Sequence, residues 1–125
     1  MLYNAKNKSV EIGNTSMNYA EFGNGEKSLI MIPGLGDGLR TDNKLAHMYA
    51  LLYRKFAKGY KVYVFSQKVD MPDRYSTKKM AHDIKDAMDI LGVEQADVIG
   101  VSLGGMIAQH LAADYPKLVS KLVLV

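Results

Sequence analysis

The sequence predicts an α/β protein built on a mostly parallel sheet, with flanking helices and an antiparallel hairpin at its amino end. Apolar runs centred near residues 30, 63, 99 and 123 are typical of strands, and helical patterns lie between them. This alternation favours a parallel sheet with right-handed crossovers. A chain of 125 residues, 48% of them hydrophobic, is large enough for one small domain with its own core.

Residues 8–22 predict the hairpin, because apolar and polar residues alternate on both sides of a turn at Gly13 and Asn14. Residues 29–32 form a continuous apolar run, which indicates a strand buried on both faces. The next loop, residues 33–38 (PGLGDG), has three glycines, so we expect its backbone to approach another group closely. It lacks the Lys and Ser/Thr of a Walker motif and the GxGxxG spacing. An oxyanion loop with the Leu35 N–H as donor and an ordinary strand-to-helix loop both stay open.

Two helices and a strand are predicted in the middle of the chain. The first helix begins after Thr41 or Asn43, and the strand covers residues 60–65. The expected buried face of that helix consists of Leu45, Met48, Leu52 and Phe56. The second helix begins at Ser76 or Thr77 and stops before Gly92. Its expected buried face consists of Met80, Ile84, Ala87, Met88 and Leu91.

Residues 97–106 (DVIGVSLGGM) predict a strand that turns sharply into a helix, with Ser102 at the turn. A serine in this strained position brings its neighbours close together, so small residues are expected before and after it. Those small residues are Gly100, Gly104 and Gly105. The serine hydroxyl would lie beside the first N–H groups of the helix, including that of Leu103, which favour a developing oxyanion. The alternative is a tight strand-to-helix turn in which Ser102 only caps the helix.

The chain resembles the N-terminal half of an α/β-hydrolase-fold protein of the serine esterase or lipase type. The resemblance covers nearly the whole chain and is carried by residues 33–36, residues 100–106 and a closing strand at residues 121–125. It implies a serine hydrolase of carboxylic esters or related acyl substrates, working through an acyl-enzyme. Ser102 matches the nucleophile, the backbones of Leu35 and Leu103 match the oxyanion donors, and the structural glycines are Gly34, Gly36, Gly100, Gly104 and Gly105. Many members have a histidine where this chain has Pro33; that histidine is usually structural.

The same resemblance implies that residues 1–125 are the N-terminal portion of a single domain. In the family the acid and the histidine of the triad follow the serine along the chain, beyond the strand at residues 121–125. Of the histidines present, His110 is about 12 Å from Ser102 along one helix, and His82 is expected on the surface. His47 is the least unsuitable base, while Asp37 and Asp70 are expected to be turn or capping residues. We therefore expect this chain alone to be inactive.

A non-catalytic module with a vestigial serine, serving to bind a partner, is the alternative function. A halide-displacing enzyme is less well supported, because its chemistry needs a carboxylate in place of Ser102.

Composition sets further expectations. The absence of cysteine, of a signal-peptide pattern and of a long apolar run predicts a cytoplasmic protein without a membrane segment. The net charge of +3 comes with scattered lysines, so no nucleic-acid partner is expected. No metal or organic cofactor is implied, and a small acyl compound is the expected substrate. The apolar strand at residues 122–125 has no downstream partner here, which predicts self-association through this edge.

Overall fold

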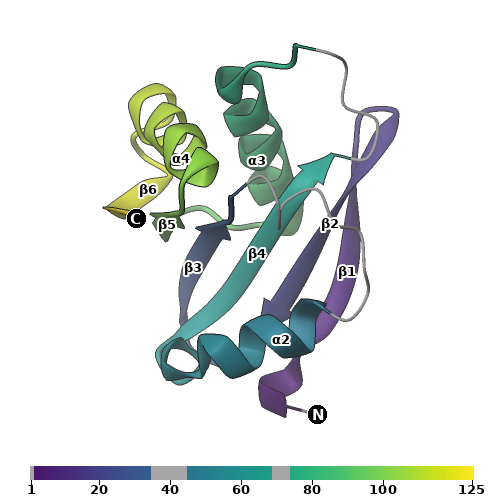
Figure 1. Cartoon of the computed structure of the whole chain (residues 1–125), viewed down its shortest axis with the longest axis vertical. Helices are drawn as coiled ribbons and strands as arrows, with labels where there is room; N and C mark the ends of the chain where they lie inside the picture. The colour runs from purple at the N-terminus through teal and green to yellow at the C-terminus, as the bar shows by residue number, and fades with distance from the viewer. Residues whose placement is uncertain (1, 35–44, 69–73) are drawn as a thin grey trace.

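The computed structural model describes residues 2–34, 45–68 and 74–125 and shows one mixed sheet with helices on both faces (Figure 1). The helices α3 and α4 lie side by side, and α2 crosses the sheet apart from them (Figure 1). The elements in chain order are η1 (Leu2–Asn4), β1 (Lys6–Ile12), β2 (Thr15–Phe22), β3 (Lys27–Ile32), α2 (Leu45–Leu52), η2 (Arg54–Phe56), β4 (Tyr60–Lys68), α3 (Thr77–Leu91), β5 (Ala96–Gly100), α4 (Leu103–Asp114) and β6 (Val119–Leu124).

The strand order is β1-β2-β4-β3-β5-β6. The two pairs β1–β2 and β2–β4 are antiparallel, whereas β3–β4, β3–β5 and β5–β6 are parallel. The predicted α/β fold, with an amino-terminal hairpin on a mostly parallel sheet, is therefore confirmed. Parallel strands place their carboxyl ends at one edge of the sheet, where ligand sites form in open α/β sheets.

The central strands are buried on both faces, as predicted for residues 29–32. Ile30 and Ile32 of β3 point to the core under α3 and α4, and Leu29 and Met31 point to the core under α2. All four of these side chains are at most 5% exposed. Burying such a run contributes about 25 cal/mol per Å² of apolar surface, so β3 anchors both layers of the fold.

Helix α3 begins and ends where the sequence predicts. The Ser76 side chain accepts a hydrogen bond from the Lys79 backbone N–H at 3.1 Å, and Gly92 ends the helix in the left-handed conformation. Four of the five residues expected in the core are buried, and the fifth, Leu91, packs against it. No helix in the described ranges is long and apolar enough to cross a membrane.

The predicted buried face of the first helix is wrong at Met48 and Leu52, whereas Phe56 of η2 packs against the core as expected. Met48 and Leu52 are 42% and 62% exposed, whereas Ala46, Tyr49 and Ala50 are buried against the sheet. The helix carries apolar residues on all sides, so no single stripe identified its inner face. Small alanine side chains let the helix lie close to β1 and β2. The caps expected at Thr41 or Asn43 lie outside the described residues.

The last strand, β6, is not covered as a buried strand. Leu122, Val123, Leu124 and Val125 are between 37% and 75% exposed. The strand pairs with β5 on one side, and in the sheet order no strand follows it on the other. This exposure agrees with the expectation that the apolar strand at residues 122–125 has no downstream partner here.

Candidate active site

The backbone of Ser102 has the strain that the sequence predicts for a nucleophile elbow. Its φ of 56° and ψ of −118° lie in a region that residues with a side chain rarely adopt. Such a conformation costs about 1–3 kcal/mol and persists only where the surrounding structure enforces it. Ser102 directly precedes α4, and its exposed side chain makes no capping hydrogen bond. The reading of Ser102 as a mere helix cap therefore has no support from this geometry.

Backbone hydrogen bonds to three strands hold the elbow in place. The Val101 N–H donates to the Ile32 carbonyl of β3 at 3.0 Å. The Ser102 N–H donates to the Val125 carbonyl at 2.9 Å, and the Val125 N–H donates to the Gly100 carbonyl at 2.9 Å. Ser102 thus lies at the carboxyl edge of the sheet, fixed between β3 and the end of β6.

The glycines around Ser102 differ in how strictly they are required. A Cβ built on Gly104 would lie 1.9 Å from the Ile32 carbonyl oxygen, and one on Gly100 would lie 2.5 Å from the Gly104 carbonyl oxygen. No side chain fits at these distances, so both positions need glycine for the strand and the helix to meet. A Cβ on Gly105 would come no closer than 3.5 Å to its neighbours, which is ordinary contact. The steric reason given above for Gly105 therefore does not hold.

The loop after β3 approaches the serine through Gly34. A Cβ built on Gly34 would lie 3.5 Å from Ser102 Cβ and 4.0 Å from Ser102 Oγ. The backbone of this loop therefore begins directly beside the hydroxyl, as an oxyanion loop requires. Leu35 and Gly36 lie outside the described residues, as do Asp37 and Asp70.

The first turn of α4 presents its amide groups next to the hydroxyl. The N–H groups of Gly104 and Gly105 donate to the carbonyls of Val101 and Ser102, each at 2.9 Å. In the described part of the chain, the Leu103 N–H makes none of the bonds that close this turn. The amino end of a helix carries a partial positive charge, so this amide is suited to a negatively charged oxygen.

An apolar cavity of about 400 Å³ opens beside the same loop. It lies on the α2 side of the sheet, between that helix and strands β5 and β6. Its lining includes Pro33, Gly34, Tyr53, Phe56, Val101 and Val125. The cavity and the serine share the loop that begins at Gly34, although the cavity extends away from the hydroxyl along the sheet.

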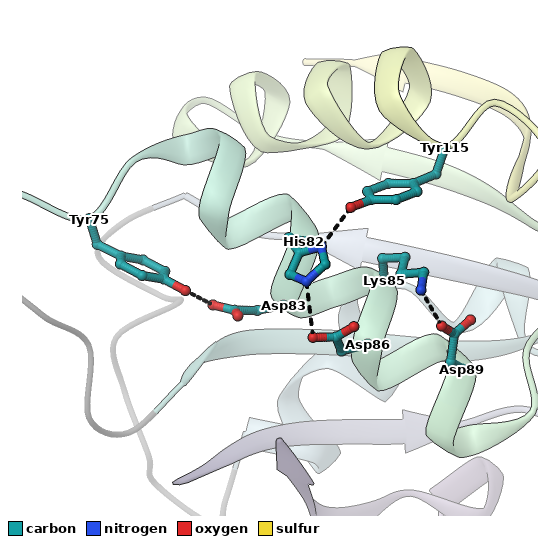
Figure 2. Close-up of polar contacts among 7 residues, drawn as sticks. All are labelled: Tyr75, His82, Asp83, Lys85, Asp86, Asp89 and Tyr115. Carbon is teal, nitrogen blue, oxygen red and sulfur yellow. Dashed lines mark hydrogen bonds and ion pairs between the residues drawn. The ribbon is translucent and has the colours of Figure 1, made fainter. Parts of the chain in front are cut away.

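Neither histidine with a described side chain lies at the serine. His110 is eight residues further along α4, about 12 Å away by helix geometry. His82 is exposed on α3, as predicted, and contacts Tyr115 beyond the opposite end of α4 (Figure 2). The backbone of His47 belongs to α2, but its side chain is not described. Among the described residues, no group of three or more metal-binding side chains could hold a metal ion.

One cluster of reactive side chains was not predicted. His82 lies between Tyr115 and Asp86, with Lys85 and Asp89 on the next turn of α3 (Figure 2). The spacing of His82 and Asp86, four residues apart on a predicted helix, was a usable signal for half of this cluster. Tyr115 reaches His82 only because α3 and α4 pack side by side, and the local sequence pattern does not predict this packing.

Comparison with known proteins agrees with the fold. The model of the alpha/beta hydrolase fold family matches residues 27–125, so the chain belongs to this family. It is 29% identical to a 2-hydroxy-6-oxononadienedioate/2-hydroxy-6-oxononatrienedioate hydrolase of Pseudomonas sp over 116 residues, which are 89% of this chain and 40% of that protein. It is 28% identical to epoxide hydrolase 1 of Caenorhabditis elegans over 115 residues, 91% of this chain and 28% of that protein.

Among solved structures, ALR0039, an alpha/beta hydrolase of Nostoc sp PCC 7120, matches with a TM-score of 0.79 at 26% identity. That match covers 99% of this chain and 43% of the Nostoc protein. The chain thus spans less than half the length of each of these three proteins.

Proposed function

We propose that the protein carrying this chain is a serine hydrolase that acts on carboxylic esters or related acyl substrates. The observation that carries the proposal is the strained serine at φ 56°, held between glycines at the edge of a parallel sheet. The named hydrolases among its relatives support hydrolysis as the reaction. A serine rather than a carboxylate at the elbow favours acyl transfer over displacement at an epoxide or alkyl carbon.

In the proposed mechanism, Ser102 Oγ attacks the carbonyl carbon of the acyl substrate. The carbonyl oxygen becomes an oxyanion, which accepts a hydrogen bond from the Leu103 N–H at the start of α4. By the family resemblance, the Leu35 N–H is the second donor; it follows Gly34, whose backbone lies beside the hydroxyl. The proton removed from Ser102 passes to the leaving oxygen, so that the alcohol departs, and water then hydrolyses the acyl-serine to the acid and free Ser102.

A serine hydroxyl needs a base within hydrogen-bond distance to become a good nucleophile. Neither His82 nor His110 meets this requirement, as shown above. We infer that the base and its carboxylate partner belong to the part of the fold that this chain does not span. The chain alone is then expected to be nearly inert toward esters and toward serine-directed fluorophosphonates.

The test is steady-state hydrolysis of p-nitrophenyl acetate by the protein extended through the remainder of the fold. Replacing Ser102 with Ala should lower kcat by about four to six orders of magnitude, since removal of a triad member has this effect in well-studied hydrolases. The exposed Ser120 provides a matched control, and Ser120→Ala should leave turnover unchanged. A loss of less than tenfold in Ser102→Ala would contradict the assignment of the nucleophile, and no turnover by the extended protein with Ser102 in place would favour the non-catalytic module.

A further inference from the structure

Outside the elbow, one hydrogen bond and one ion pair link three side chains on the surface between α3 and α4 (Figure 2). His82 Nδ1 lies 2.6 Å from the Tyr115 hydroxyl oxygen. His82 Nε2 lies 3.5 Å from Asp86 Oδ2, one helical turn further along α3. The His82 side chain is 57% exposed, so solvent and small reagents reach the cluster directly.

The position of Asp86 determines which ring nitrogen of His82 can act as a base. An ionised carboxylate only accepts hydrogen bonds, so it favours the neutral tautomer that carries its proton on Nε2. In that tautomer the lone pair of Nδ1 faces the Tyr115 hydroxyl, 2.6 Å away, and the hydroxyl is the donor. A hydroxyl nucleophile, a histidine base and a carboxylate that orients the base are the parts of an activated nucleophile.

We propose that Tyr115 is an acyl acceptor in its own right, activated by His82 and oriented through Asp86, and independent of Ser102. With an activated ester, the Tyr115 oxygen forms a bond to the carbonyl carbon while its proton passes to His82 Nδ1. The bond from that carbon to the leaving phenolate then breaks. The imidazolium returns its proton to solvent, and the product is a tyrosine ester.

Two other tyrosines have hydroxyl groups that bond to a carboxylate and not to a histidine. The Tyr60 hydroxyl donates to Asp97 Oδ2 at 2.5 Å, and the Tyr75 hydroxyl donates to Asp83 Oδ2 at 2.8 Å. In both pairs a carboxylate takes the place of the histidine. The hydrogen bond to Asp97 raises the pKa of Tyr60, which makes that phenol a poorer nucleophile at neutral pH. Tyr60 is therefore a natural comparison for Tyr115 within the same molecule.

The charges around the cluster also favour reaction at Tyr115. Lys85 Nζ lies 5.8 Å from the centre of the Tyr115 ring and pairs with Asp89 at 2.6 Å. On the α4 side, Asp114 lies 3.9 Å from Lys78 of α3. The cation of Lys85 stabilises the negative charge that develops on the phenol oxygen during attack.

The experiment is acetylation of the 125-residue chain by p-nitrophenyl acetate, followed by tandem mass spectrometry of tryptic peptides. Ser102 and Tyr115 fall in one peptide, residues 86–117, so the Ser102→Ala variant is used as the parent. In this parent, Tyr115 should be acetylated at least tenfold faster than Tyr60 or the exposed Tyr3. His82→Gln, which keeps a hydrogen-bonding side chain but removes the base, should lower the Tyr115 rate at least tenfold.

The pH profile separates a chemical role of His82 from a structural one. The Tyr115 rate in the parent should level off at high pH because a side chain is the base, whereas in His82→Gln it should keep rising with hydroxide. In Asp86→Asn the carboxylate no longer selects the tautomer, so the rate on the plateau should fall. A Tyr115 rate less than tenfold above that of Tyr3, or one that His82→Gln leaves unchanged, would overturn the proposal. Thermal unfolding of each variant followed by circular dichroism would show that the fold is intact.

Discussion

At Ser102, a residue with a side chain occupies a backbone conformation that glycine would adopt more easily. The φ of 56° brings a cost of about 1–3 kcal/mol, which the hydrogen bonds to Ile32 and Val125 on either side help to offset. The same conformation exposes the hydroxyl above the end of β5. Strain and exposure therefore have one cause, the sharp turn between β5 and α4.

Two adjacent glycines of this turn should respond differently to the same substitution. Gly104→Ala places a Cβ 1.9 Å from the Ile32 carbonyl oxygen, so α4 must move away from β3. We expect a loss of about 2–4 kcal/mol in the free energy of unfolding, or no folded protein. In Gly105→Ala the new Cβ meets only ordinary contacts, and alanine is favoured over glycine in a helix by up to about 1 kcal/mol.

Urea unfolding followed by circular dichroism measures both variants under identical conditions. The expected order of stability is Gly105→Ala, then the parent chain, then Gly104→Ala. Equal effects of the two substitutions would contradict the close approach of α4 to β3 that fixes the elbow.

At the scale of elements, three strands of the sheet are tied together by one carboxylate. Glu21 of β2 lies 2.9 Å from Lys8 Nζ of β1 and 3.0 Å from Lys61 Nζ of β4, and its side chain is only 12% exposed. Burial opposes ionisation of this group, but the hydrogen bonds from Lys8 and Lys61 outweigh it and lower the pKa of Glu21. The folded state therefore holds the ionised form more tightly than the unfolded state does.

The direction of this shift predicts how stability depends on pH. Because the pKa of Glu21 is lower in the folded chain, its contribution is complete above the unfolded value and is lost as pH falls through the folded value. Glu21→Gln should thus lower the free energy of unfolding by about 1 kcal/mol at pH 7, and the difference from the parent should shrink below about pH 4. Urea unfolding between pH 3 and pH 7 measures this difference. Glu11→Gln is the control, because Glu11 is an exposed residue of β1. A difference that stays constant with pH would show that the ion pairs contribute nothing.

Elements with local start and stop signals were predicted well from the sequence. In α3, Ser76 caps one end, Gly92 stops the other, and the apolar period between them selects a single buried face. In α2 the apolar residues surround the helix, so the inner face follows from close packing of Ala46 and Ala50 on the sheet. That packing depends on residues far away in the sequence, so the sequence of the helix itself does not show which face is buried.

The features of the site also differ in how far the local sequence predicts them. The elbow at Ser102 was predictable because its strand, glycines and helix are contiguous in the chain. The contact between His82 and Tyr115 joins two helices whose packing no local pattern specifies, so this cluster came from the structure alone. Neither His82 on α3 nor His110 on α4 lies near enough to Ser102 to be its base.

At the scale of the whole molecule, the sheet is open, with β1 of the hairpin at one edge and β6 at the other. Val125 both donates to Gly100 and accepts from Ser102, so its backbone groups face β5. Alternation along a strand then turns the N–H and carbonyl of Leu124 toward the outer edge. The side chains of β6 are exposed as well, and the apolar cavity beside Val123 and Val125 continues this surface. An apolar edge with unpaired backbone groups is a template for another strand.

The 125-residue chain on its own should therefore self-associate by pairing β6 with β6 of a second copy. Leu124→Pro removes the outward N–H, and the ring blocks an approaching strand, while the bonds from β6 to β5 use other residues. Leu124→Ala is the matched control, because it shortens the same side chain and keeps the N–H. Sedimentation equilibrium at micromolar concentration should show assemblies for the parent and for Leu124→Ala, and monomers for Leu124→Pro. A well-folded parent that stays monomeric over this range would mean that β6 is protected from pairing, and equal association of both variants would place the contact elsewhere.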